Sequence, residues 1–211
     1  MTSFARRERT ALCDLMDQVG PDHPTLCAGW TTYDLAAHLW VRESDPMAGP
    51  GLVFSAFADT TEERMAGIKK HYDYPTLVGK IRNGPPTLSV FSVPLLGDRA
   101  NAIEYFVHHE DVRRTDLAAV PRDLPGKDQD ELWRLFRVAA RGLMRSAPNG
   151  VKLRRPDGSS AHVKGGDPVV TVTGEPSELV LFGYGRGSVA DVVLTGDESA
   201  VSALREASLG I

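Results

Sequence analysis

The chain has 211 residues, of which 42% are hydrophobic and 25% are charged, a composition typical of a folded globular protein rather than a disordered one. Its 28 acidic residues outnumber its 24 lysines and arginines, so the sequence offers no broad basic surface and we expect no nucleic-acid partner. No stretch approaches the roughly 20 apolar residues that span a bilayer, and the N-terminus lacks the apolar core of a signal peptide, which favours a cytoplasmic protein with no membrane partner.

From residue 1 to about residue 147, apolar side chains recur at the three- and four-residue spacings of amphipathic helices. Thr31 or Thr32 can cap one of these helices, and Pro75 can open another. The predicted helices cover residues 3–19, from about 32 past 42, about 60–71, 75–84, about 99–116 and 128–147. Helices of this kind, joined by loops, form a bundle.

The pattern changes near Pro148, Asn149 and Gly150, which interrupt any regular element. Downstream, β-branched segments predict two strands within residues 151–163 and one strand each within residues 167–174 and 189–197. Helices are predicted over residues 175–187 and, after an aspartate cap, over 197–207. We therefore predict an α+β fold, with a helical domain over residues 1–148 and a small α/β domain over residues 149–211.

The segment "NAIEYFVHHEDVRR", residues 101–114, lies in one of the predicted helices. Each helical residue advances by about 100°, so Glu104, His108 and Asp111 share one face, while His109 lies on another. An isoleucine and a valine flank the shared face, which indicates that the three polar side chains point into the bundle. His109 is therefore not equivalent to its neighbour.

A buried carboxylate and a buried imidazole each need a partner, and a single divalent cation can satisfy both. The alternative is an ordinary helix-supporting pair between Glu104 and a histidine or arginine one turn away. His38 lies between Leu35 and Leu39 on an earlier helix and should also point inward, which favours a metal because bundles often assemble metal sites from facing helices. Spacing alone leaves both interpretations open.

Three segments resemble a known family. "PTLCAGWTTYDLAAHLWVRE" and "EYFVHHEDVRR" resemble the two metal-binding segments of DinB-like helical bundles, in the actinobacterial branch related to mycothiol-dependent maleylpyruvate isomerase. "VTVTGEPSELVLFGYGRGSVADVVLTGD" resembles the small C-terminal domain of that branch. The resemblance implies a DinB-like four-helix-type bundle followed by a sterol-carrier-like α/β domain.

The resemblance also implies site residues. His38, Glu104 and His108 become the metal ligands, and Asp111 becomes a residue that supports a ligand or packs the helix. Arg186, in "GYGRG", matches the arginine of a family motif that reaches toward the active site. The alternative for Arg186 is a surface arginine that follows a helix.

Two imidazoles and one carboxylate leave an open position on a tetrahedral ion, as in catalytic zinc sites. The family relationship implies mycothiol as cofactor, and a bound cation would favour the thiolate form of such a thiol. Our leading hypothesis is a zinc-dependent, mycothiol-using isomerase or thiol transferase that acts on a small electrophile, with Arg186 holding a carboxylate or developing negative charge. The alternatives are a non-catalytic metal-binding protein and a zinc hydrolase with hydroxide in the open position.

Overall fold

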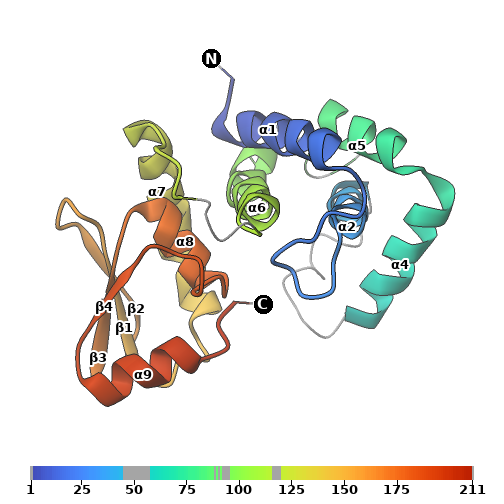
Figure 1. Cartoon of the computed structure of the whole chain (residues 1–211). Coiled ribbons are helices and arrows are strands. Elements are labelled where there is room, and N and C mark those ends of the chain that lie inside the picture. Colours follow the sequence, from blue (N-terminus) through green and yellow to red (C-terminus); the bar gives the residue numbers. More distant parts are fainter. Residues whose placement is uncertain are drawn as a thin grey trace. The chain divides into compact units, whose positions relative to one another are not determined.

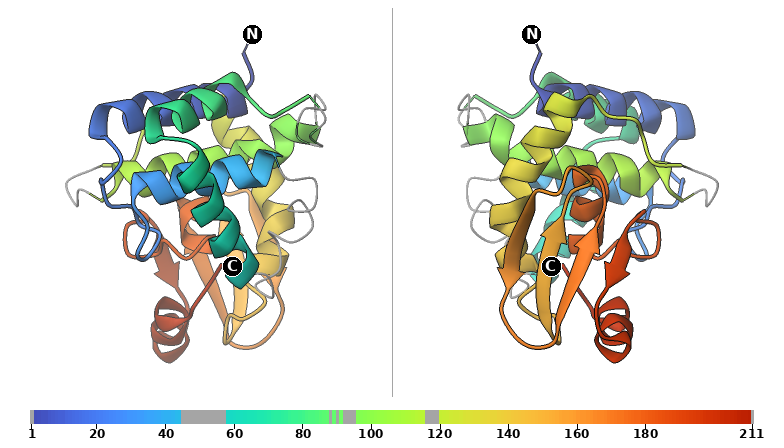
Figure 2. Two further views of the ribbon diagram at one scale, coloured as in Figure 1. Left: turned by 90° about the vertical axis from the view of Figure 1, so that its right-hand side faces the viewer. Right: turned by 90° about the vertical axis from the view of Figure 1, so that its left-hand side faces the viewer.

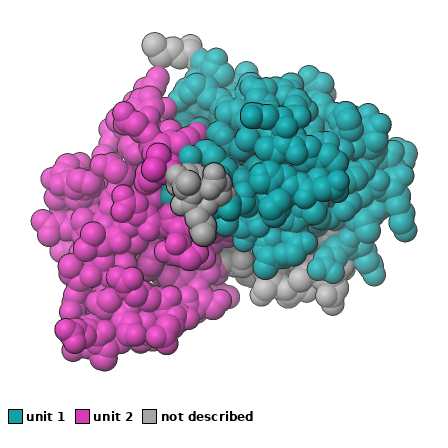
Figure 3. Space-filling view, in the orientation of Figure 1, with its two compact units in different colours: residues 1–119 teal, residues 120–211 magenta. Residues whose placement is uncertain are grey.

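The computed structural model describes residues 2–44, 58–87, 89, 91, 96–115 and 120–210. It confirms the predicted α+β fold and divides into two compact units, residues 1–119 and residues 120–211 (Figure 3). Within the described residues, no helix is both long enough and apolar enough to cross a membrane.

Unit 1 is helical within its described residues (Figure 1). Its helices are α1 (Phe4–Val19), α2 (Thr32–Ser44), α4 (Ala58–His71), α5 (Tyr74–Asn83) and α6 (Leu96–Arg113). Helix α1 packs on α5 and α6, while α2 packs on α4 and α5, as the two side views show (Figure 2). All five lie where the apolar spacing predicted helices.

Local signals explain where these helices begin and end. The Ser3 side chain accepts a hydrogen bond from the Arg6 amide and caps α1, and the Asp73 side chain caps α5 by accepting from the Thr76 amide at 3.0 Å. Helix α1 ends at Gly20, whose φ of 83° suits glycine.

Helix α6 has an apolar face and a polar face. Its apolar face contributes Tyr105 and Val112 to the hydrophobic core that also includes α1, α2 and α5. A stripe of polar residues follows the helix at spacings of three and four residues: Asn101, Glu104, His108 and Asp111. Asn101, His108 and Asp111 are buried, and Glu104 is half-buried. This stripe makes α6 one wall of the site described below.

Unit 2 is described without a gap over residues 120–210 and combines helices with a four-stranded sheet. Its elements are α7 (Gly126–Leu143), β1 (Gly150–Arg154), β2 (Ser160–Lys164), β3 (Val169–Thr173), α8 (Pro176–Gly183), β4 (Val193–Thr195) and α9 (Glu198–Glu206). The strand order is β2-β1-β3-β4, with β1 and β3 parallel and the two outer pairs antiparallel.

The division between the units lies before α7, earlier than the change of pattern at residues 148–149. Helix α7 packs on α8, and Gln129 of α7 exchanges hydrogen bonds with the Ser177 backbone amide and hydroxyl at 2.9 and 3.1 Å. A Cβ on Gly183 of α8 would lie 2.3 Å from Phe136, so α7 and α8 can meet this closely only with glycine there. Helix α7 therefore belongs to unit 2, where it packs on α8 and β2.

Candidate metal centre

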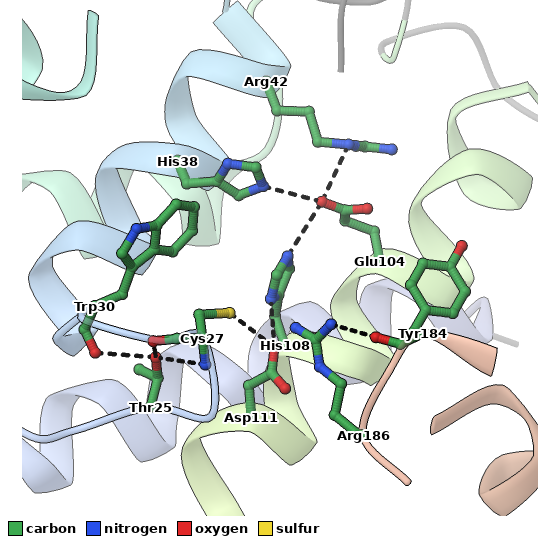
Figure 4. Close-up of polar contacts among 10 residues, drawn as sticks. All are labelled: Thr25, Cys27, Trp30, His38, Arg42, Glu104, His108, Asp111, Tyr184 and Arg186. Carbon is green, nitrogen blue, oxygen red and sulfur yellow. Dashed lines mark hydrogen bonds and ion pairs between the residues drawn. The ribbon is translucent and has the colours of Figure 1, made fainter. Parts of the chain in front are cut away.

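Three side chains from two helices of unit 1 converge at one carboxylate oxygen (Figure 4). The Nε2 atoms of His38, on α2, and His108, on α6, each lie 3.3 Å from Oε1 of Glu104. One ligand atom from each residue lies within 4.8 Å of the other two. The structure therefore brings together the three residues that the family resemblance implied as metal ligands.

This geometry suits a divalent cation. Bonds of about 2.0–2.1 Å to a tetrahedral zinc ion place neighbouring ligand atoms about 3.3–3.4 Å apart. The two nitrogen–oxygen separations of 3.3 Å match that spacing, and two imidazoles with one carboxylate form a donor set that zinc and several other divalent ions accept. The same atoms are also close enough for hydrogen bonds, so in the absence of an ion Glu104 has partners.

His108 is supported on its far side. Its Nδ1 lies 2.9 Å from Oδ2 of Asp111, a carboxylate that is fully buried. Burial by itself would lower the pKa of His108, but hydrogen bonds to Asp111, Cys27 and Glu104 outweigh it and hold this pKa well above its usual value. An Asp111 carboxylate on Nδ1 leaves Nε2 as the atom that faces Glu104 and fixes the orientation of the ring.

Cys27 joins this arrangement from a loop. Its thiol donates to Oδ2 of Asp111 across 3.2 Å, and the Leu26 amide donates to the Asp111 backbone carbonyl across 2.9 Å. The Thr25 hydroxyl accepts from the Cys27 amide at 3.2 Å and donates to the Trp30 carbonyl at 3.0 Å, which holds the loop in a tight turn. A second possible ligand group, Cys27, His108 and Asp111, therefore shares His108 with the first.

His38 has weaker support than His108. Its ring centroid lies 5.1 Å from that of Trp30 and 5.2 Å from that of His108. Its Nδ1 is buried and has no hydrogen-bond partner among the residues that the structure describes. Burial lowers the pKa of His38, and its hydrogen bond to Glu104 opposes this shift only in part. His38 is therefore held as a neutral imidazole, the form that binds a metal.

An arginine also contacts the central carboxylate. Nε of Arg42 lies 3.3 Å from Oε1 of Glu104, the same oxygen that the two histidines approach (Figure 4). Burial would raise the pKa of Glu104, but the Arg42 charge and the hydrogen bonds from His108 and His38 outweigh it, so this pKa lies well below its usual range. Glu104 is thus an anion in the folded protein.

Arg42 belongs to a buried chain of polar contacts that crosses three helices. Its Nη1 donates to Oδ1 of Asn101, and Nδ2 of Asn101 donates to Glu43 at 3.0 Å. Glu43 in turn forms a two-armed ion pair with Arg9 of α1, one arm of which measures 2.7 Å. The chain Arg9–Glu43–Asn101–Arg42 therefore ends at Glu104 and links α1, α2 and α6.

The remaining polar residues of α6 face elsewhere. Nδ1 of His109 lies 3.0 Å from Oε2 of Glu8 on α1, away from the Glu104 face, as the helical spacing predicted. Glu110 is fully buried and accepts from Arg113 at 2.9 Å and from Arg114. Neither residue contributes an atom to the converging ligand groups.

Arg186 lies in unit 2, in the turn that follows α8. Its backbone amide donates to the Leu181 carbonyl at 2.9 Å, and its Nη1 donates to the Tyr184 carbonyl at 2.6 Å (Figure 4). Gly185, between Tyr184 and Arg186, has a φ of 82°, which explains why this turn needs glycine. Arg186 is half-buried rather than a fully exposed surface arginine.

Two residues that contact the candidate ligands or their supports, Arg42 and Cys27, were not predicted as site residues. Arg42 is one helical turn after His38, so the spacing that made His38 an inward residue also applied to it. The structure also places the thiol of Cys27 on Asp111, beside His108. Cys27 lies in a loop, where no periodic pattern indicates direction.

Known protein families and solved structures support this fold. Residues 111–203 match the family described as the MDMPI C-terminal domain. The crystal structure of a mycothiol-dependent maleylpyruvate isomerase matches with a TM-score of 0.60 and 17% identity, covering 92% of this chain and 96% of that one. A histidine-to-alanine mutant of that isomerase matches over the same shares, with a TM-score of 0.57 and 16% identity.

No curated protein matches the chain. The family match and the two structures confirm the predicted resemblance to the branch related to mycothiol-dependent maleylpyruvate isomerase. At these identities the likeness to the solved structures establishes the fold.

Proposed function

We propose that unit 1 binds one divalent metal ion, zinc in the first place, through His38, Glu104 and His108. We further propose that the protein is a cytoplasmic, mycothiol-dependent isomerase or thiol transferase acting on a small electrophile. The observation that carries the proposal is the approach of both Nε2 atoms to one Glu104 oxygen at 3.3 Å. The family match and the two structural neighbours support the choice of thiol chemistry.

Burial is the second support for a functional site. Glu104, His38 and His108 form a charged cluster in the interior of the bundle, where an ionised carboxylate is costly unless it is compensated. A purely structural helix pair would need only two of these residues, on one helix. Here Asp111 orients His108, and Trp30 packs beside His38, so each imidazole is held with Nε2 toward the same point.

A bound divalent ion would supply a positive charge at an open position that stabilises the thiolate form of an incoming thiol. The chain's own residues hold the three donor atoms and keep both imidazoles facing Glu104. Cys27 is engaged by Asp111, so in this proposal the nucleophile is the small-molecule thiol rather than a protein cysteine. Addition of the thiolate to one carbon of a double bond, rotation about the resulting single bond and departure of the thiolate as the double bond re-forms would complete an isomerisation.

Arg186 is retained in the proposal as the residue that holds a substrate carboxylate or developing negative charge. Its support is its match to the family motif, its half-buried position and the turn that fixes its backbone. Replacing Arg186 by lysine or methionine should lower kcat/KM while leaving the metal content unchanged. An unchanged kcat/KM in both variants would remove Arg186 from the site.

The metal is tested first, by elemental analysis of protein purified without a histidine tag. We expect about one equivalent of a divalent ion in the wild type and near-complete loss in His38→Ala and His108→Ala. His109→Ala is the matched control. His109 pairs with Glu8 rather than with the ligands, so this variant should keep its metal. Undiminished metal in both ligand variants would refute the assignment.

Thiol chemistry is tested separately on the metal-loaded protein, with mycothiol and a panel of small electrophiles. Thiol-dependent isomerisation or transfer supports the proposed function. Turnover that persists without thiol would indicate a hydrolase, although Glu110, the nearest spare carboxylate in sequence, is engaged by Arg113 and Arg114. Metal binding without any thiol binding or turnover would indicate a structural metal.

A further inference from the structure

Arg42 gives the candidate metal centre an unusual balance of charge. Glu104 is the one carboxylate among the three proposed ligands, and both histidines are neutral when they bind a metal. The Arg42 guanidinium lies 3.3 Å from Glu104 Oε1 and cancels that single negative charge. The Asp111 carboxylate lies on the far side of the His108 ring, and the Glu43 carboxylate is paired with Arg9.

The distance from Arg42 to a bound ion has an upper limit. An ion about 2.1 Å from Glu104 Oε1 could lie no more than about 5.4 Å from Nε of Arg42, because that nitrogen is 3.3 Å from the same oxygen. Two positive charges this close repel each other appreciably in a partly buried site. An anion at the open coordination position would relieve this repulsion.

Arg42 is held in this position by more than Glu104. Its Nη1 donates to Asn101, whose own amide is engaged by Glu43, and its guanidinium lies 4.4 Å from the centre of the Phe91 ring. These contacts hold the guanidinium in place when a cation arrives, so the positive charge stays near the ion. A flexible surface arginine could instead move away into water.

We propose that Arg42 couples metal binding to anion binding: it weakens the affinity of the site for the ion alone and strengthens the affinity of the loaded site for an anionic ligand. This inference rests on the proposed metal site and extends its chemistry. Arg42 would act as a positioning residue that favours an anionic fourth ligand, such as a thiolate, over a neutral one. It would also select among ligands by charge rather than by shape.

The test uses Co²⁺ in the full-length protein, with azide as an anionic probe that has no thiol chemistry. Competition with a chromophoric chelator measures the Co²⁺ affinity, and the visible spectrum of bound Co²⁺ reports azide binding. Arg42→Gln removes the charge, and Arg42→Lys keeps it. Arg82→Gln is the matched control, because Arg82 pairs with Asp14 and Asp17 away from the ligand cluster.

In Arg42→Gln we expect Co²⁺ to bind about tenfold more tightly without azide and azide to bind the loaded site about tenfold more weakly. Arg42→Lys should retain most of the coupling, and Arg82→Gln all of it. Equal azide affinity in the wild type and Arg42→Gln would overturn the inference while leaving the metal site intact. Coupling without thiol turnover would support Arg42 and count against the proposed enzyme, and failure of the wild type to bind Co²⁺ would overturn both.

Discussion

The two units differ in what they bury. Among the described residues, unit 1 buries nine acidic, basic or histidine side chains: Glu8, Arg9, Arg42, Glu43, His108, His109, Glu110, Asp111 and Arg114. In residues 120–210, unit 2 buries Asp128 and Glu178. Its other buried residues are the uncharged polar Gln129, Asn149 and Ser177 and apolar side chains such as Leu153, Val170 and Leu179.

This contrast suggests that the interiors of the two units serve different purposes. Buried ion pairs seldom add net stability compared with well-packed apolar residues, because desolvation offsets their attraction. Unit 1 nevertheless carries the contact chain from Arg9 through Glu43 and Asn101 to Arg42, which ends at the proposed ligand Glu104. The proposed metal site would account for the buried charges of unit 1, whereas the interior of unit 2, with few buried charges, serves stability.

The largest expected effect comes from breaking this chain at its buried ion pair. Glu43→Leu leaves the Arg9 guanidinium without its two-armed carboxylate partner, and should cost about 3 to 5 kcal/mol of unfolding free energy. Chemical denaturation, with hydrogen exchange resolved to segments of unit 1, measures the loss.

The double variant Arg9→Met with Glu43→Leu provides the control, because it removes both charges. Its stability should lie much closer to that of the wild type than to that of the single variant. If both variants lose equal stability, the charge of Arg9 is not the cause and the contrast between the units fails on this point.

An apolar truncation in unit 2 should have the second-largest effect. Leu153 in β1 is fully buried, and Leu153→Ala should cost about 2 to 5 kcal/mol through lost burial and a residual cavity. The metal content should stay unchanged, because every proposed ligand lies in unit 1. Hydrogen exchange that rises in the sheet at constant metal content supports the comparison, whereas metal loss would contradict it.

The sequence was sufficient to predict the elements and the face of α6. Helical geometry converts spacing into direction, so Glu104 and His108 could be assigned to one side and His109 to another without coordinates. The meeting of His38 with Glu104 is different, since these residues are 66 positions apart and their contact depends on how α2 and α6 pack. The family resemblance, rather than periodicity, supplied that pairing.

The parts of the site that were missed share a physical cause. Cys27 is placed by a turn around Thr25 and by the backbone bond from Leu26 to Asp111, neither of which leaves a periodic pattern. Arg42 had a spacing signal, but an arginine near the end of a helix is ordinarily explained by solvent or the helix dipole. Only its contact with Glu104 distinguishes it.

The smallest expected effect comes from changing Asp111, the residue that orients the proposed ligand His108. Asp111→Asn keeps an oxygen that can accept from Nδ1 of His108 but removes the charge that makes this imidazole a stronger donor to a metal. Metal affinity, measured by competition with a chelator, should fall by about 10- to 100-fold. The metal-free protein should also lose some stability, because the buried His108 loses the carboxylate that helps to keep its pKa above the usual value. Cys27→Ser is the matched control, since it changes the other partner of Asp111 and keeps the carboxylate.

This substitution separates the two explanations for a polar interior. If Asp111 serves the proposed metal, the loss of unfolding free energy in Asp111→Asn should be larger with the ion bound than without it. If Asp111 serves packing, the loss should appear equally with and without metal. A drop in unfolding free energy that is independent of metal would therefore make Asp111 a structural residue, like Glu8 and His109, and would confine the site to the three converging ligands.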